Sequence, residues 1–294
     1  MSKFKTLVSK TWIFIAAAAI IAGSSSAMAF ALNNSVPESA SANIVPFTAA
    51  IQENIQNQAP NTEVTGEYSV TDLSKSVHEQ KDIIIDKLNR IEGITPEQVE
   101  EKCNAIISNM IPGEKDISAQ QAAAYAAGIL KKAYKVDFTG YTAEASFSRS
   151  SFPNSDSWTV MFRSPEAARN DEQRWAGKTY YASVDSVNGI MLNAGSCDFD
   201  YTEENNKNLQ DPQWKNKAEQ LISALMPEDV SITGSKVVWA TPETGVTVVC
   251  ELSDGSACAV RLTGKNKEAA AYIYFPNGYD GSLDYKPLKD HGVG

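Results

Sequence analysis

The earliest clear hydrophobic pattern along the chain consists of two helical stripes. Residues from Asp72 to Ile91 place apolar side chains near i, i+4 and i+7, which predicts an amphipathic helix. A second helix should begin at Thr95, an N-cap residue that is followed by proline and by Gln98, which can reach back to the cap. Together they form a predicted helical segment at 71–113. Its apolar stripes fit either packing on the same chain or binding of a partner, and both interpretations stay open.

A longer pattern follows, in which a helix precedes segments of alternating polarity. The capping box Ser118-Ala119-Gln120-Gln121 opens an alanine-rich helix that we expect at 118–134. Period-two alternation then predicts antiparallel strands, and Asn188-Gly189 is the residue pair that a type I′ hairpin favours. The predicted strands are 141–147, 157–163, 179–184 and 190–193.

The same order of elements recurs towards the C-terminus. Asp211-Pro212 opens a predicted helix that ends near Leu225, and four strand patterns follow it. We interpret this recurrence as an internal structural duplication. The predicted fold class is therefore α+β, with two helix-on-antiparallel-sheet units at 114–200 and 210–276, preceded by an N-terminal export or anchor helix and the helical segment. The strands of the second unit are expected at 232–240, 245–252, 256–262 and 270–275.

The N-terminus has the layout of an export signal. Residues 1–29 comprise a basic start, an uncharged apolar core and small residues that end in Ala27-Met28-Ala29, the cleavage pattern of a secretory signal peptide. The uncharged run from Trp12 through Leu32 is 21 residues long, close to the ~20 that span a bilayer. Cleavage after Ala29 and a retained single anchor both fit. Because the lysines should stay inside, both options predict an extracytoplasmic protein, either secreted or anchored to the cell membrane by its N-terminal helix.

Three polar segments connect or follow these parts. Residues 30–70 are rich in Asn, Ser, Ala, Gln and Pro, which predicts a flexible stalk. The acidic run from Cys197 to Glu204 could gather oxygens around calcium, but it lacks the glycine and glutamate spacing of a calcium loop, and we interpret it as a solvated connector between the units. Residues 277–294 form a predicted C-terminal tail, on which Tyr279 and Tyr285 could contact a peptide or glycan.

The four cysteines are widely spread. No C-x-x-C pair is present and His78 and His291 are the two histidines, so a structural zinc site is not expected. Cys250 and Cys258 flank a predicted hairpin turn. A three-residue loop centred on Asp254 would place them opposite each other, whereas a two-residue turn would shift the pairing by one. An exported compartment permits a disulfide between them, and burial as small hydrophobic residues is the alternative.

Charge narrows the range of partners. The chain of 294 residues holds 26 basic and 36 acidic side chains, a net charge of −10, and 43% of its residues are apolar. Three lysines and no acid lie in the first 29 residues, so the remainder carries −13. This composition predicts a folded protein whose surface repels phosphate backbones and anionic lipids. We expect no nucleic-acid partner, and membrane contact only through the N-terminal segment.

Several residues of the first α+β unit carry a resemblance. Three stretches resemble a PepSY domain over about 117–195: the helix opening from Ile117 to Ala122, the strand from Ser157 to Phe162, and the stretch from Tyr181 to Ile190, in which Val184-Asp185 precedes Gly189-Ile190. A more decayed version lies over about 211–275, where Val260-Arg261-Leu262 replaces the Val-Asp pair. The resemblance implies a small helix-on-sheet module that lies outside the membrane and restrains peptidases. It supplies no catalytic residue.

Motifs of common enzymes are not found in the sequence. There is no H-E-x-x-H, no G-x-S-x-G, no phosphate-binding G-x-x-x-x-G-K-S/T and no helix-opening G-x-G-x-x-G. A Cys/His nucleophile pair would need His78 or His291, and we expect both to face solvent. The sequence therefore predicts no catalytic residue, no cofactor and no metal site. A pair of glycosidase carboxylates is defined by a distance and not by a spacing, so an enzyme of unidentified type stays an alternative.

These observations predict a non-catalytic binding or regulatory protein that works outside the cytoplasm. Its expected partner is a protein, either a peptidase or a component of the cell envelope. The ectodomain of a membrane-anchored sensor is the second hypothesis, and it requires the anchor to be retained.

Overall fold

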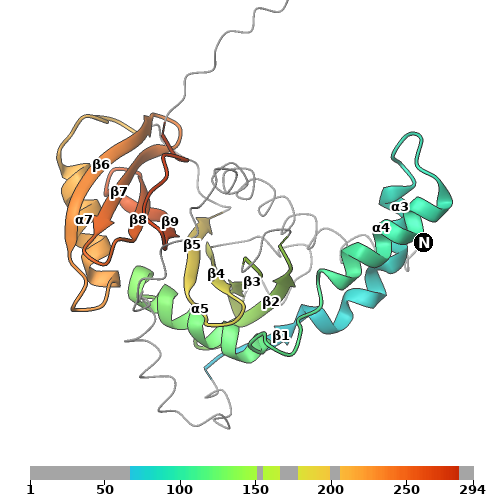
Figure 1. The fold of residues 1–294 in the computed structure, drawn as a ribbon. Coiled ribbons are helices and arrows are strands. Elements are labelled where there is room, and N and C mark those ends of the chain that lie inside the picture. Colours follow the sequence, from blue (N-terminus) through green and yellow to red (C-terminus); the bar gives the residue numbers. More distant parts are fainter. Residues whose placement is uncertain (1–66, 151–154, 166–177, 199–205, 285–294) are drawn as a thin grey trace, which may run out of the picture. The chain divides into compact units, whose positions relative to one another are not determined.

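The computed structural model describes residues 67–150, 155–165, 178–198 and 206–284, which form two compact units (Figure 1). The first unit holds the described residues up to 198, and the second holds those from 206 onward. Both combine helices with mostly antiparallel strands, which confirms the mixed α+β class. The predicted signal or anchor at 1–29 lies outside the described residues.

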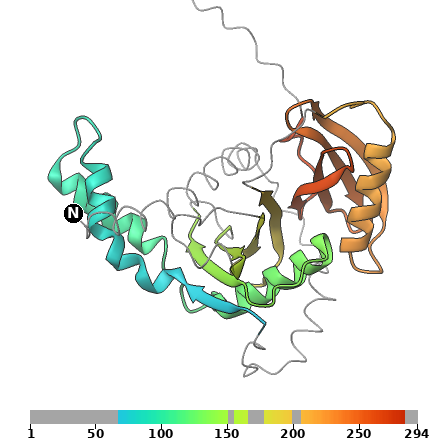
Figure 2. The same cartoon turned by 180° about the vertical axis from the view of Figure 1, so that it is seen from behind.

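Five strands lie side by side in the first unit, and one helix covers them. Helix α5 (Ala119–Tyr134) contacts every one of these strands from one face, as views from opposite sides show (Figure 1; Figure 2). The first strand runs parallel to the second, and the other neighbours are antiparallel. In spatial order the strands are β1 (Ser69–Asp72), β2 (Thr142–Ser148), β3 (Ser157–Arg163), β4 (Lys178–Asp185) and β5 (Met191–Asp198).

Burial alternates along these strands and marks the face that packs against α5. Trp158, Val160 and Phe162 of β3 are fully buried, while the residues between them are only partly buried. Helix α5 contributes a row of buried alanines, which lets its backbone approach the sheet closely. The strand residues of this face are Ala143, Ala145, Phe147, Trp158, Val160, Phe162, Tyr180, Ala182 and Val184.

A buried serine ties the start of α5 to the ends of two strands. Ser186 donates from its Oγ to the Asp116 carboxylate at 2.6 Å, and its carbonyl accepts from the Ile117 N–H at 2.7 Å. Its own N–H donates to the carbonyl of Asp156 at 3.0 Å. Beside it, Trp158 Nε1 donates to the Ile117 carbonyl at 2.9 Å. We call these four hydrogen bonds the Ser186 cluster, and they fix where α5 begins.

The turn between β4 and β5 is not the type I′ turn that Asn188-Gly189 favours. Residues 186–190 connect the strands, instead of the two residues of a type I′ turn, and Gly189 alone of the predicted turn pair has a positive φ, at +71°. Asp185 caps this turn, because its Oδ1 accepts from the N–H groups of Val187 and the next residue at 3.0 Å each. Gly189 lies against the Tyr125 ring of α5. The Asp and Gly of the PepSY-like pattern are therefore turn and packing residues.

Two sequence predictions near residue 72 were wrong. Strand β1 includes residues 69 and 70, which we had assigned to the stalk at 30–70, so the folded part begins before the predicted boundary. The single helix expected from Asp72 to Ile91 is instead a 3₁₀ helix, η1 (Leu73–Gln80), followed by α3 (Lys81–Leu88). Asp72 accepts from the Ser74 N–H at 3.0 Å, which opens the tighter helix.

The next two helices confirm their predicted caps. Helix α4 (Pro96–Ser108) begins at Thr95, whose Oγ1 accepts from the Gln98 N–H while the Gln98 side chain accepts from the Thr95 N–H. The same reciprocal pair forms between Ser118 and Gln121 at the start of α5. Both helices thus satisfy two of their free N-terminal donors locally, as capping boxes do.

The second unit is a helix followed by four strands. Helix α7 (Gln213–Leu225) contacts β6, β7 and β8 and buries Trp214, Ala218 and Ile222. This element order repeats the helix and the β2–β5 meander of the first unit, as predicted, while a common origin of the units stays a prediction. The strands are antiparallel in the spatial order β9 (Glu268–Phe275), β8 (Ala257–Thr263), β7 (Gly245–Leu252) and β6 (Ile232–Thr241).

Asn206 joins two turns of the second unit and precedes its predicted boundary at 210. Its N–H and Nδ2 both donate to the carbonyl of Pro242, in the β6–β7 turn, at 2.7 and 2.8 Å. Its Oδ1 accepts from the N–H of Gly264, in the β8–β9 turn, at 2.7 Å. The asparagine is buried, so each of these bonds is protected from water.

The described part of the predicted C-terminal tail is packed on the second unit. Tyr279 accepts from the Leu283 N–H at 2.9 Å, donates to the Asp284 carboxylate and lies edge-on to the Phe275 ring. Tyr279 and Leu283 pack against the sheet face that lies opposite α7. Tyr279 therefore has an intramolecular packing role. Tyr285, its predicted companion, lies outside the described residues.

Replacing Gly189 with alanine should destabilise the first unit. A Cβ would lie 2.5 Å from the Tyr125 ring, and the positive φ disfavours any L side chain, so we expect the free energy of unfolding to fall by about 2–4 kcal/mol. Gly93→Ala is the matched control, because Gly93 also has a positive φ but no atom within 4 Å of its Cβ position. Its loss should be about 1 kcal/mol. Urea denaturation measures both, and equal losses would contradict the packing role.

Candidate functional site

The helical segment folds on itself. Elements η1, α3 and α4, which we call the helical hairpin, share a core in which Val99, Cys103 and Ile107 of α4 meet Val77 and Leu88. Partly buried side chains surround this core. The apolar stripes therefore pack on the same chain, which was one of the two alternatives left open by the sequence. The surrounding residues are Ile84, Ile85, Ile94, Met110 and Ile111.

Arg149 connects the helical hairpin to the sheet. Its backbone N–H donates to the carbonyl of Asn109 at 2.7 Å, just past the end of α4, and its guanidinium donates to the carbonyl of Ile111 at 3.4 Å. The guanidinium also lies 3.6 Å from Asp156 and over the Phe147 ring. No local sequence pattern marks Arg149, because Asn109 and Ile111, to which it donates, lie about forty residues earlier in the chain.

The exposed side of the helical hairpin carries a groove of about 570 Å³. Its lining comes from the end of α3, the α3–α4 turn and one side of α4. Apolar side chains provide half of it, and the rest is polar or glycine, with one acid and one lysine. The lining residues are Leu88, Ile91, Glu92, Gly93, Ile94, Gln98, Lys102, Ala105, Ile106 and Asn109.

Two isoleucines of this groove are exposed to solvent. Ile91 is 52% exposed and Ile106 is 37% exposed, whereas the neighbouring Ile107 is buried in the hairpin core. Successive side chains of a helix point about 100° apart. At the edge of an apolar stripe, one of two adjacent isoleucines can therefore face the core while the other faces solvent. Ile106 and Ile107 are adjacent on the apolar side of α4, and only the packing of α3 on α4 separates their roles.

The face of the first sheet opposite α5 is polar. The Arg163 guanidinium donates to the Glu144 carboxylate in an ion pair between β3 and β2. On the next strands, the hydroxyls of Thr159 and Ser183 lie 3.0 Å apart. Thr159 and Ser183 are direct register partners, and Arg163 lies diagonally across from Glu144. These bonds pair most of the polar groups named here, while the Arg163 Nε is buried without a hydrogen-bond partner among the described residues.

The histidines and the acidic run were considered as possible catalytic or metal-binding groups, and the sequence predicted neither kind of site. His78 is exposed on η1, as expected, and His291 lies outside that part. No group of three His, Cys, Asp or Glu side chains within the described ranges has the geometry to hold a metal ion. The acidic run from Cys197 to Glu204 lies mostly outside these ranges, so neither its calcium nor its connector interpretation is tested.

Asp211 illustrates a carboxylate with a structural role. Its Oδ1 accepts from the backbone N–H of Gln213 at 2.9 Å, at the start of α7, and its carboxylate also pairs with Lys267. The backbone hydrogen bond, with a contribution from Lys267, lowers the pKa of Asp211. The aspartate thus stays ionised at the positive end of the helix dipole.

Cys250 and Cys258 lie directly opposite each other on β7 and β8. A three-residue loop centred on Asp254 joins these strands, as one of the two predicted turns required. Both side chains are buried on the face towards α7. Burial raises the pKa of Cys250 to about 12 and also raises the pKa of Cys258. A disulfide between them stays a prediction.

The membrane and export predictions concern a part of the chain that the structure does not describe. Between residues 67 and 284, leaving aside 151–154, 166–177 and 199–205, no helix is long and apolar enough to cross a bilayer. The cleavage residues Ala27 and Ala29 precede this range. Signal cleavage and anchoring are therefore untested.

Comparison with known proteins gives one weak structural similarity. No family model matches the sequence, and no curated protein matches it. Among solved structures, the chain is similar to the Bacillus megaterium YpeB C-terminal domain, with 11% sequence identity and a TM-score of 0.36. The match covers 59% of this chain and 68% of that chain. The PepSY resemblance of residues 117–195 thus stays a prediction from the sequence.

Thiol labelling should distinguish the two interpretations of the cysteines. Cys197 is exposed and the other three are buried, so a thiol reagent should label about one cysteine per native chain and all four after denaturation. Cys197→Ser should remove the fast reaction. A count of two in denaturant without reductant would show a Cys250–Cys258 disulfide. Fast labelling of Cys250 in the native protein would contradict its burial.

Proposed function

We propose that this chain is a non-catalytic binding protein that holds a protein partner, a peptidase or an envelope protein, in the groove of the helical hairpin. The observation that carries the proposal is the pair of exposed isoleucines, Ile91 and Ile106, on the lining of a groove whose other side is a packed core. Exposed apolar side chains beside a groove are the usual anchors of protein interfaces.

The composition of the groove favours an amphipathic helix as the segment of the partner that it receives. Apolar side chains form half of the lining, and Glu92 and Lys102 place opposite charges beside them. A helix that inserts apolar residues at i, i+3 and i+4 and exposes polar residues on its other side matches this arrangement. The mixed charges fit a helix that carries both signs, whereas a strongly charged segment would meet one like charge.

Attachment to the sheet supports a binding role for this groove. The end of α4 is held by Arg149, and the following loop is held by Asp116, which accepts from the N–H of Gly113 at 2.6 Å. Asp116 also accepts from the Ser186 hydroxyl, so the Ser186 cluster holds the base of the hairpin in place. A preorganised groove binds with a smaller loss of conformational entropy than a mobile one.

The proposed compartment is outside the cytoplasm, and the basic, apolar and small-residue order of residues 1–29 supports it. Sequencing the mature N-terminus separates a secreted chain, which would begin at Phe30, from an anchored one, which would keep its first residues. An anchored chain would suit the sensor hypothesis. A chain found in the cytoplasm with its N-terminus intact would contradict this part of the proposal.

A double substitution in the groove should weaken partner binding. In Ile91→Glu/Ile106→Glu, two apolar anchors become charged, and each should cost more than ~1 kcal/mol, so affinity should fall by roughly 30-fold or more. Val187→Glu/Val237→Glu is the matched control, because these valines are 49% and 46% exposed and lie outside the groove. The control should bind normally.

The partner is first identified by a photo-crosslinking amino acid placed at position 106 of the full chain in living cells. We expect a crosslink to a peptidase or envelope protein that is lost when the same group is placed at position 237. Isothermal titration with that partner then measures the two double variants. Equal crosslinking from both positions, or crosslinks only to a second copy of the chain, would overturn the proposal.

A further inference from the structure

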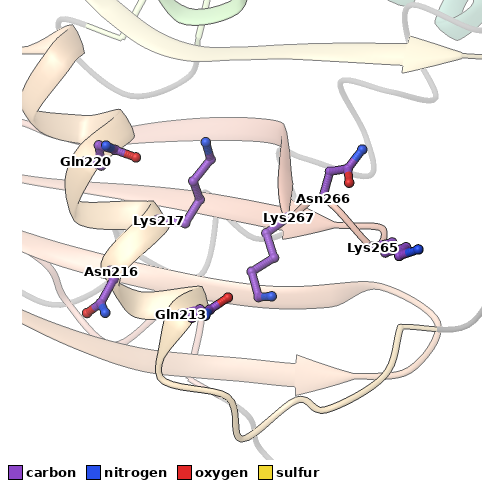
Figure 3. A pocket seen from close by; sticks show the side chains of 7 residues that line it. All are labelled: Gln213, Asn216, Lys217, Gln220, Lys265, Asn266 and Lys267. Atoms are coloured by element: carbon purple, nitrogen blue, oxygen red, sulfur yellow. The ribbon is translucent and has the colours of Figure 1, made fainter.

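A second groove, of about 430 Å³, lies on the second unit between α7 and the turn that joins β8 to β9 (Figure 3). Four of its side chains come from successive turns of one side of α7, and three come from the strand turn. None of them belongs to the helical hairpin. The lining residues are Gln213, Asn216, Lys217, Gln220, Lys265, Asn266 and Lys267.

The lining is entirely polar and carries only positive charge. It consists of three lysines and four side-chain amides, with no carboxylate, although the whole chain has a net charge of −10. All seven side chains can donate hydrogen bonds, and the four amides can also accept them. Local charge of the opposite sign to that of the molecule marks this groove as a place where an anion is attracted.

Both walls of the groove are held in place. The β8–β9 turn is closed by the Lys267 N–H, which donates to the Gly264 carbonyl at 3.1 Å, and Asn206 holds the Gly264 N–H from the other side. Lys267 then crosses to α7, where its ammonium lies 3.2 Å from Asp211 and over the Trp214 ring. The groove thus exists before any ligand arrives.

The three lysines differ in how their charge is balanced. Lys267 is paired with Asp211, so it mainly joins the two walls. Lys217 and Lys265 form no ion pair among the described residues. Figure 3 shows Lys217 on α7 and Lys265 on the turn, with Lys267 between them. Two uncompensated ammonium groups therefore border a space lined by amides.

We infer that this groove binds a hydroxyl-rich anion, namely a polyol or sugar that carries a phosphate or carboxylate group. Lys217 and Lys265 supply the positive charge for the anionic group, and charge-assisted hydrogen bonds of this kind are the stronger ones. The amides of Gln213, Asn216 and Gln220 both donate and accept, which matches hydroxyl groups. The volume is sufficient for a small molecule or one unit of a polymer.

The same lining disfavours two other classes of ligand. No aromatic side chain lines the groove, and the nearest indole, Trp214, is covered by Lys267, so a nucleobase would find no stacking surface. No apolar side chain lines it either, so an apolar peptide would gain little by entering. The ligand is selected by its charge and hydroxyl groups.

Isothermal titration of the full chain with glycerol 1-phosphate and with glucuronate tests this inference. The two probes distinguish a phosphate from a carboxylate source, and inorganic phosphate and glycerol are the reference ligands. We expect at least one probe to bind with a dissociation constant on the order of 1 mM, more tightly than both reference ligands and more weakly at higher salt. Binding of inorganic phosphate as tight as that of glycerol 1-phosphate would overturn the assignment of a hydroxyl-rich ligand.

Lys217→Gln/Lys265→Gln should weaken this binding by about tenfold or more, because it removes both uncompensated charges and keeps polar side chains. The matched control is Lys207→Gln/Lys215→Gln, which removes the same charge from exposed positions of the second unit that do not line the groove. The control should bind as the unaltered chain does. Equal weakening in both variants, or no binding of either probe at about 10 mM, would overturn the inference.

This inference does not depend on the proposed partner groove. Ile91→Glu/Ile106→Glu should leave the anion titration unchanged, and Lys217→Gln/Lys265→Gln should leave partner binding unchanged. Failure of one proposal is therefore visible separately from failure of the other. Circular dichroism of each variant confirms that loss of binding does not come from loss of fold.

Discussion

The hydrogen bonds around Ser186 decide the geometry of the first unit. Ser186 forms hydrogen bonds with Asp116 and Ile117, which lead into α5. It also bonds to Asp156, the residue just before β3. Because Ser186 is fully buried, an unpaired donor or acceptor at this place would cost about 1–3 kcal/mol. The position of α5, the start of β3 and the end of β4 are thus fixed together, and the helical hairpin is attached next to them.

The two grooves proposed as binding sites lie outside the two helix-on-sheet cores. In the first unit, the face of the sheet towards α5 is filled by its own side chains, from Trp158 to Phe162, and the groove lies on the helical hairpin that precedes α5. In the second unit, α7 buries Trp214 and Ile222, while the side chains along its flank line the groove between α7 and the β8–β9 turn. The cores serve as supports, and both proposed binding grooves use residues that these supports leave unburied.

The sequence predicts most elements because their signals are local. Capping boxes at Thr95 and Ser118 and period-two alternation in β3 and β7 depend on residues a few positions apart, so these elements were placed within a residue or two. The four residues of β1 are too few to show alternation, and they become a strand only by pairing with β2. Their register partner is more than seventy residues away.

The sites were harder to predict than the fold. Ile106 and Ile107 are chemically identical in the sequence, and the packing of α3 on α4 makes one a core residue and the other an exposed one. Three strands separate Lys217 from Lys265 along the chain, and the net charge of −10 gives no sign that basic residues gather in one place. A basic groove on an acidic chain becomes visible only when positions distant in the sequence are brought side by side.

The hydrogen bonds of Asn206 have a mechanical consequence. Asn206 is the first described residue of the second unit, and it holds the β6–β7 and β8–β9 turns at once through Pro242 and Gly264. A pull transmitted along the chain from the first unit would reach this buried amide before it reached α7. The force would be divided over several hydrogen bonds to two turns, so the second unit would resist being unravelled from its N-terminal end.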